Sequence, residues 1–97
     1  MGEPAARLGD MHSCEIEDPE PHVGGPIDSP GCRTVLIGGQ PAACEGDEAT
    51  CCVGPPDMIL EGSETVFIGG LPAARMGDPA VHGGKIVEGC LSVEIGG

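Results

Sequence analysis

Hydrophobic and polar residues alternate in three short stretches of the chain. Each stretch reads Val-x-Ile followed by Gly-Gly, at residues 35–39, 66–70 and 93–97. A period of two predicts a short β-strand with its Val and Ile on one face, and the glycines allow a tight turn after it. No stretch combines a helix start signal with a helical apolar stripe. The pattern therefore predicts an all-β fold of short strands and turns, with a core around one axis made of Val35, Ile37, Val66, Ile68, Val93 and Ile95.

These stretches belong to a longer internal repeat. Residues 35–47 and 66–78 realign at an offset of 31 residues, with nine of thirteen positions identical. Residues 4–10 repeat the second half of this unit, and residues 93–97 repeat the first half. The two chain ends thus complete one another. We predict a single domain over residues 1–97, made of three units that close into a small pseudo-threefold body with adjacent termini.

Composition limits the core and the partners. The 97 residues include 18 Gly and 10 Pro but one Phe and no Trp or Tyr, so the core will be thin. The Gly and Pro recur in register with Val and Ile, which argues against disorder. A net charge of −12 disfavours binding to nucleic acid or to an anionic membrane surface.

Nothing in the sequence has the features of a targeting or membrane segment. There is no eighteen-residue apolar run, and the first residues, Met-Gly-Glu-Pro-Ala-Ala-Arg, contain neither a basic nor an apolar signal region. We expect synthesis in the cytoplasm and no classical export signal. In that reducing compartment, thiolate metal ligation is favoured over disulfides for the six cysteines.

Candidate metal ligands gather in the segments that follow each Gly-Asp. No Cys-x-x-Cys pair occurs, so a site must be assembled from separated loops. These three segments hold every histidine and three of the cysteines: His12, Cys14 and His22, then Cys51 and Cys52, then His82.

The similar triplets at residues 22–24, 52–54 and 82–84 suggest one ligand from each loop, with His12 as the fourth. A closed tetrahedral set of nitrogen and sulfur ligands suits zinc. We therefore predict Zn²⁺ bound by His12, His22, His82 and Cys52, with Cys51, Cys14 and Cys90 open as alternatives for the cysteine.

Other polar residues are interpreted as structural. Cys32 and Cys90 each lie three residues before a strand Val, where the other unit has Ser63, so we interpret them as small turn residues. The aspartates of the Gly-Asp pairs are expected to accept nearby backbone N–H groups. No serine nucleophile motif, His-Glu-x-x-His or phosphate-binding loop occurs, so we do not expect an enzyme.

The units PAARLGD, PAACEGD and PAARMGD, with their VxIGG strands, resemble the repeats of the proline-alanine-alanine-arginine (PAAR) family. The resemblance covers essentially the whole chain. It implies a small cone whose base sits on the trimeric spike protein of a type VI secretion system or related phage-tail-like contractile injection system. It also implies a metal ion near the sharp end, bound through three His and one Cys. Cys44 departs from the motif, because it stands where the other units have Arg7 and Arg75.

The resemblance implies a structural tip that sharpens the spike for membrane piercing and effector delivery. We expect one copy per spike trimer, effector proteins as further partners, and export by the injection machine. Leu36 and Phe67 should point away from the core and are candidate spike contacts, whereas Glu94 stands at the equivalent place in the third unit. Two alternatives stay open, a zinc-dependent hydrolase and a disulfide-linked secreted binding module.

Overall fold

The strands are short and connected by turns. The structure, a computed structural model, describes residues 2–14, 24–51 and 55–96. No helix forms in these segments, which confirms the predicted all-β fold, and none of them could cross a bilayer as an apolar helix. The strands are β1 (Glu3–Ala5), β2 (Ile27–Ser29), β3 (Cys32–Ile37), β4 (Gln40–Ala42), β5 (Glu48–Ala49), β6 (Asp57–Met58), β7 (Phe67–Ile68), β8 (Leu71–Pro72) and β9 (Cys90–Ile95).

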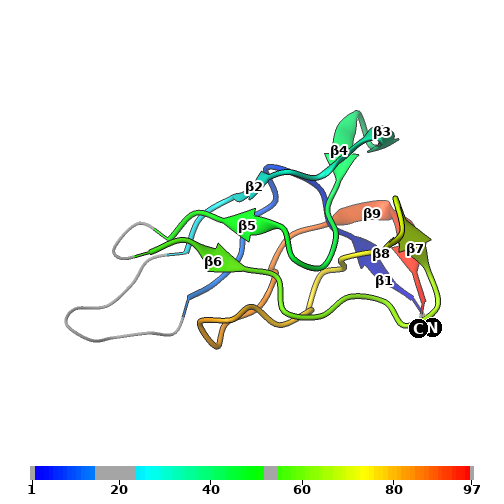
Figure 1. Cartoon of the computed structure of the whole chain (residues 1–97). Coiled ribbons are helices and arrows are strands. Elements are labelled where there is room, and N and C mark those ends of the chain that lie inside the picture. The colour runs from blue at the N-terminus through cyan, green and yellow to red at the C-terminus, as the bar shows by residue number, and fades with distance from the viewer. Residues whose placement is uncertain (1, 15–23, 52–54, 97) are drawn as a thin grey trace.

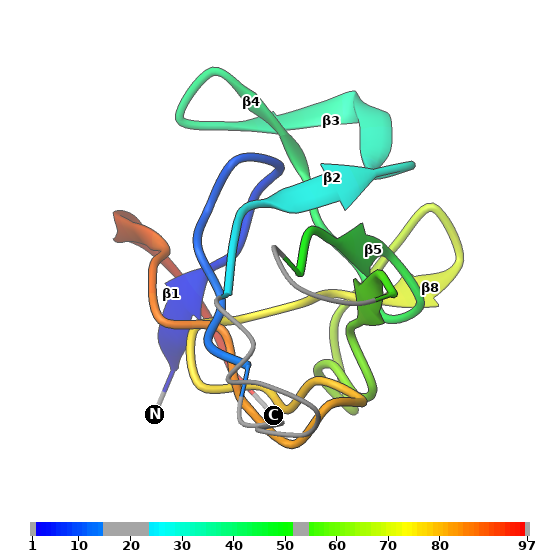
Figure 2. The same ribbon diagram turned by 90° about the vertical axis from the view of Figure 1, so that its left-hand side faces the viewer.

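Three antiparallel strand pairs gather at one end of the body, which we call the base. They are β3–β4, β7–β8 and β1–β9, and Figure 2 shows them spread around the long axis. The opposite end, which we call the apex, is formed by the segments 11–14, 50–51 and 79–84 that follow each Gly-Asp. The sheet β2–β5–β6 lies toward the apex (Figure 1). The body measures 37 × 25 × 22 Å, consistent with a small cone.

Closed rings of backbone hydrogen bonds join the three units at the axis. Ala6 N donates to Ala74 O, Ala43 N to Ala6 O, and Ala74 N to Ala43 O, over 3.0, 3.1 and 2.9 Å. Each residue is the second alanine of a Pro-Ala-Ala, so no large side chain keeps the three backbones apart. A second ring runs between the units in the opposite sense, from Leu8 N to Pro41 O, Glu45 N to Pro72 O and Met76 N to Pro4 O. These rings show the pseudo-threefold arrangement directly.

The core differs from the predicted one. Ile37 and Ile95 are buried and Val66 and Ile68 are partly buried, but Val35 and Val93 remain 37% exposed. Alanines lie on the axis where the three backbones meet, and three isoleucines pack with them. The inner cluster consists of Ala6, Ala43, Ala74, Ala49, Ile27, Ile59 and Ile86.

The two chain ends meet in the base. Strands β1 and β9 pair antiparallel, with Glu3 opposite Ile95, and both lie at the same end of the body (Figure 1). The first and last strands of the described chain therefore lie side by side, as the split repeat predicted. The base hairpin of this unit is built from both ends of the chain.

The sequence analysis interpreted Cys32 and Cys90 as turn residues, but this interpretation was wrong. They are the first residues of β3 and β9. Cys90 packs with Ala5, Ile37 and Ile95 in a second cluster near the base. Its thiol therefore takes part in the core.

The aspartates of the Gly-Asp pairs have the predicted structural role. Asp10 and Asp78 accept the backbone N–H of Arg7 and Arg75 at 2.9 and 2.7 Å, and each also binds the guanidinium three residues before it, at 2.9 and 2.8 Å. Asp47 accepts the corresponding backbone N–H, from Cys44 at 2.8 Å, and also that of Gly31, but Cys44 provides no guanidinium for it. Each carboxylate closes the turn that leads from the axis to the apex.

Candidate metal centre

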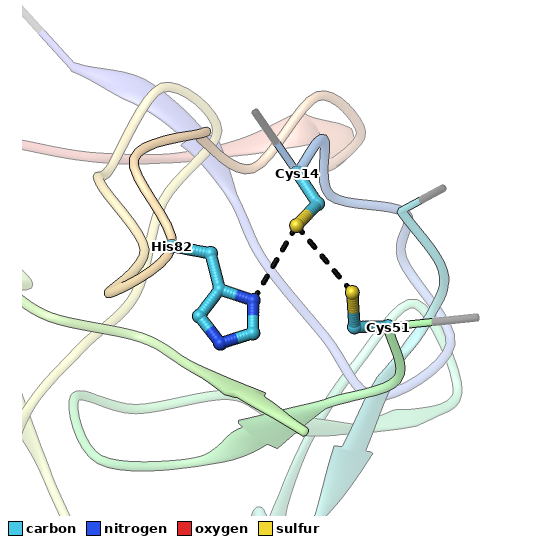
Figure 3. A group of neighbouring side chains, drawn as sticks. All are labelled: Cys14, Cys51 and His82. Atoms are coloured by element: carbon cyan, nitrogen blue, oxygen red, sulfur yellow. Dashed lines mark hydrogen bonds between the residues drawn. The ribbon is translucent and has the colours of Figure 1, made fainter. Parts of the chain in front are cut away.

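Two thiols and one imidazole converge at the apex. Cys14 Sγ lies 3.4 Å from Cys51 Sγ and 3.4 Å from His82 Nδ1 (Figure 3). The ligand atoms of the three residues all lie within 4.8 Å of one another. Cys51 is buried, and Cys14 and His82 are half-buried. Each of the three units contributes one side chain to this group, which we call the apical triad.

Backbone contacts between the units hold the triad in place. Ser13 N, next to Cys14, donates to Lys85 O at 2.8 Å, and Thr50 N, next to Cys51, donates to Pro26 O at 2.9 Å. His82 sits in a tight turn, in which Gly83 N donates to Ala80 O at 3.0 Å. Gly83 completes this turn at φ +98°, a conformation that other residues rarely adopt. The positions of all three side chains are thus set by hydrogen bonds within and between units.

The spacing of the triad suits a tetrahedral metal ion. Two thiolates bound to one zinc ion at about 2.3 Å lie about 3.8 Å apart, close to the observed separation of 3.4 Å between the two sulfurs. Thiolate and imidazole are ligands that zinc and other borderline-soft ions accept. The apical triad can therefore hold a metal ion with little movement of its side chains.

His12 lies beside the triad but turns its ring elsewhere. It is 3% exposed, with Nδ1 2.7 Å from Gly25 O and Nε2 3.0 Å from Asp57 Oδ2. Both ring nitrogens thus already have hydrogen-bond partners in Gly25 and Asp57, and the ring is directed at these residues and not at the triad. Asp57 is 1% exposed, and its Oδ1 accepts His82 N at 2.9 Å. Asp57 thereby links His12 to the loop that carries His82.

Comparison with known families agrees with this geometry. The sequence matches the PAAR motif family over residues 17–88 of its 97 residues. The chain belongs to the PAAR motif family. Proteins of this family are structural rather than enzymatic and in general sit on a spike trimer, so the match supports a spike-tip role in general. A search of curated proteins finds no match to this chain.

The structure brings together some of the predicted ligands of this PAAR protein. His82 lies with Cys14 and Cys51, two of the cysteines that the sequence left as alternatives. His12 is not in this group, and the third alternative, Cys90, lies in the cluster near the base. His22 and Cys52 lie outside the described residues. The predicted set of four ligands therefore stays a prediction.

A different register of the repeat identifies the triad. Cys14, Cys51 and His82 each stand four residues after the aspartate of a Gly-Asp pair. Counting forward from each Gly-Asp pair therefore selects three equivalent positions. Counting two residues back from Gly24, Gly54 and Gly84 instead selects His22, Cys52 and His82. The Gly-Asp register thus selects the three residues that the described part of the chain brings together.

The sequence analysis missed Asp57, although the repeat contains a signal for it. Asp57 stands two residues before Ile59, at the position where the other units have Gly25 and Gly84. His12 likewise replaces a buried alanine, since its equivalents two residues after the Gly-Asp aspartate are Ala49 and Ala80. Two departures from the repeat, His for Ala and Asp for Gly, contact one another across the axis.

Three surface cavities lie along the body and away from the triad. One, of 480 Å³, is lined by residues around Arg75 and Asp78, and another, of 330 Å³, by residues around Arg7 and Asp10. A third, of 120 Å³, lies at the equivalent position beside Cys44. None of these three is lined by a residue of the triad, so no substrate-sized hollow among them leads to the metal ligands.

Proposed function

We propose that this PAAR protein is a non-enzymatic tip that caps the trimeric spike of a contractile injection system, with one copy on each trimer. The observation that carries the proposal is the closed ring of hydrogen bonds between Ala6, Ala43 and Ala74. One chain thereby acquires three nearly equivalent sides. Such a body can contact the three identical ends of a true threefold partner in the same way.

Exposed apolar side chains on the base support a docking surface there. Leu36 on β3 is 62% exposed and Phe67 on β7 is 58% exposed. The third unit has Glu94 at the equivalent position, but Leu91 on the same strand, β9, is 79% exposed. Each side of the base therefore offers at least one apolar side chain to a partner, and continuation of the partner's strands would pair further backbone groups.

We further propose that the apical metal ion is Zn²⁺. Cys14, Cys51 and His82 would bind it, and His22 and Cys52 remain the predicted sources of further ligands. The bound ion would supply a cross-link between the three units at one point, which matters because a thin core stabilises a chain of this size poorly. A zinc ion closed by protein ligands is structural and has no open position for a reacting water.

The proposed setting follows the family role. The protein would be made in the cytoplasm, leave the cell on the spike without a signal peptide, and carry effector proteins as further partners. The apex would pierce the target membrane and would not bind to it. The metal-held apex would receive the force of contraction, while the base keeps the spike's open end covered.

Native mass spectrometry with the trimeric spike protein encoded alongside this chain tests both parts of the proposal. We expect one PAAR chain on three spike chains, with the mass of one zinc ion on each PAAR chain. A complex of three PAAR chains with three spike chains, or no binding to the spike, would refute the capping role. Absence of bound metal from protein purified without chelators would refute the zinc site.

Paired variants locate the contact surface. Leu36→Ser with Phe67→Ser should weaken spike binding without changing the zinc content, because both side chains are exposed on the base. Met58→Ser is the matched control, since Met58 is also exposed but lies on β6 toward the apex. If Met58→Ser weakened binding as much as the base variant, the base would not be the docking surface. Hydrolysis of model esters that requires the zinc ion would favour the hydrolase alternative.

A further inference from the structure

The two sulfurs of the apical triad are close enough to form a covalent bond with a small movement. Cys14 Sγ and Cys51 Sγ are 3.4 Å apart, and a disulfide bond is about 2.05 Å long. The other described cysteines have oxygen partners instead: Cys32 contacts Thr34, Cys44 contacts Ile68 O, and Cys90 contacts Ser92. Within the described part of the chain, the apex thus holds the one sulfur pair found in contact.

Backbone contacts keep this pair together whether or not an ion is present. Ser13 and Lys85 share two further contacts beyond the Ser13 N–H bond, from Lys85 N to Ser13 Oγ at 3.0 Å and from Ser13 Oγ to Lys85 O at 3.3 Å. Thr50 N is bound to Pro26 O on the other side. Neither set of contacts involves a sulfur atom. The two cysteines therefore stay within reach of one another when their thiols are not ligands.

We propose that Cys14 and Cys51 form a disulfide when the apex has no metal ion and a small-molecule disulfide such as oxidised glutathione is present. The apex then has two alternative cross-links, a metal ion or a covalent bond. They exclude one another because both use the same two sulfur atoms. The inference rests on the apical triad and does not depend on the spike as partner.

The two thiols differ in exposure, which sets the order of the exchange. The half-buried Cys14 attacks the small disulfide, a mixed disulfide forms, and one small thiol leaves with the proton of Cys14. The buried Cys51 then attacks the Cys14 sulfur and forms the internal bond. The second small thiol leaves with the proton of Cys51. In total one small disulfide is reduced to two thiols, and the protein loses two hydrogen atoms.

The alternative cross-link has a consequence that rests on the proposed function. A tip that leaves a reducing cytoplasm enters surroundings in which disulfides persist. If it loses its metal ion there, the disulfide would keep the first and second units joined at the apex. The shape of the apex would then survive metal loss outside the cell.

The test is thiol mapping of the isolated protein with and without zinc. Metal-free protein is treated with oxidised glutathione, the remaining thiols are alkylated, and the peptides are identified by mass spectrometry. We expect a Cys14–Cys51 link as the main product. Zinc held at about 100 times its dissociation constant leaves about one chain in a hundred without metal, so the link should form about 100-fold more slowly. Equal rates with and without zinc would overturn the proposal.

Serine variants decide which sulfurs react. Cys51→Ser should abolish the internal link and leave a glutathione adduct on Cys14, whereas Cys52→Ser, its immediate neighbour, should keep the link. Cys90→Ser serves as a distant control. A link that survives Cys51→Ser, one that maps to Cys52, or a mixture of unrelated pairs would each overturn the proposal. Spike binding is measured separately by native mass spectrometry. Absence of the Cys14–Cys51 disulfide can therefore be distinguished from absence of the capping role.

Discussion

The apex and the base are held together in different ways. At the base, similar sequences form the three strand pairs β3–β4, β7–β8 and β1–β9. At the apex, side chains from all three units meet at one point, and the units carry different residues there. His12 contacts Asp57, whereas the equivalent positions in the other units are alanine and glycine.

The difference has a steric cause. Residues far from a threefold axis each have their own space, so three large side chains can coexist, as Leu36, Phe67 and Glu94 do on the base. Residues close to the axis compete for one volume, and the large His12 stands where its equivalents Ala49 and Ala80 are small. Ile27, Ile59 and Ile86 nevertheless repeat exactly in the inner cluster, so this restriction applies at the level of His12 and not to the whole axis.

The arginines of the motif connect these two regions. Arg75 Nη1 donates to Gly96 O at 3.1 Å, which ties the third unit to the end of β9. In the middle unit, Cys44 Sγ reaches Ile68 O at 3.5 Å in place of a guanidinium. Burial raises the pKa of the Cys44 thiol to about 11, so this thiol stays protonated at neutral pH. Of these two contacts, the one in the middle unit, from Cys44 to Ile68, is therefore the weaker.

The largest expected effect comes from adding one carbon at the apex. A Cβ at Gly84 would collide with the backbone oxygen of Ser13, and backbone cannot move aside as a side chain can. Gly84→Ala should therefore lower the free energy of unfolding by about 5 kcal/mol or more, measured by urea denaturation. It should also reduce the yield of folded protein, so circular dichroism of the purified product is a second measurement.

Gly96→Ala is the matched variant at the base. No atom lies within 4 Å of the Cβ that it would add, so its effect should stay within about 0.5 kcal/mol. Similar losses for Gly84→Ala and Gly96→Ala would contradict the idea that the backbones approach one another more tightly at the apex.

A smaller effect is expected from the buried pair. Asp57→Asn removes the carboxylate that His12 and His82 N contact, and it should cost about 3 kcal/mol because a buried polar network loses its central charge. Thermal and urea denaturation measure the loss. Glu94→Gln on β9 is the base control and should change the stability by less than about 0.5 kcal/mol, because Glu94 is exposed.

A double variant sharpens this prediction. His12→Ala with Asp57→Gly gives the first and second units the residues that their equivalents carry. The double variant should lose less stability than the sum of the two single changes, because neither partner is then left buried alone. Additive losses would show that His12 and Asp57 are not coupled.

The smallest effects are expected from exchanging residues between units. Arg75→Cys should cost about 2 kcal/mol by leaving the buried Asp78 without its guanidinium, and Cys44→Arg should gain about 1 kcal/mol by giving Asp47 one. Denaturation midpoints compare the two. A stabilising Arg75→Cys, or a Cys44→Arg that loses several kcal/mol, would contradict the assignment of equivalent positions.

The pH dependence of Cys44→Arg provides a further check. Burial raises the pKa of Asp47 in the folded protein, so the folded state holds this proton more tightly than the unfolded chain does. The contribution of Asp47 to stability therefore falls as the pH rises from the ordinary carboxyl pKa through the raised value. A guanidinium beside the carboxylate should weaken this fall, and an unchanged pH profile would argue against a new contact.

Several features could be predicted from the sequence because they depend on local chemistry. The Val-x-Ile-Gly-Gly stretches predicted strands followed by turns, and β3 and β9 end at Ile37 and Ile95 as expected. The split repeat predicted that the termini meet, which β1 and β9 confirm. The aspartates of the Gly-Asp pairs were predicted to bind backbone N–H groups, which lie within three residues of them.

The residues that form the core and the site were harder to predict, because their roles depend on how far each residue lies from the axis. Alternation indicates which side chains share a face of a strand but not how far that face lies from the centre, so Val35 was predicted to be buried and is exposed. The sequence also left several cysteines open as ligands, and only the folded chain shows that Cys14 and Cys51 lie together with His82.

The sequence by itself thus determined the strands, the turns, the ring and the presence of soft ligands near the Gly-Asp turns. Each of these follows from residues that are neighbours in the chain or from repetition along it. Only the tertiary structure decided that Cys14, Cys51 and His82 meet while His12 turns to Asp57. Which of several side chains occupies a shared axis depends on how three separate backbones pack, and that information is not contained in any one repeat.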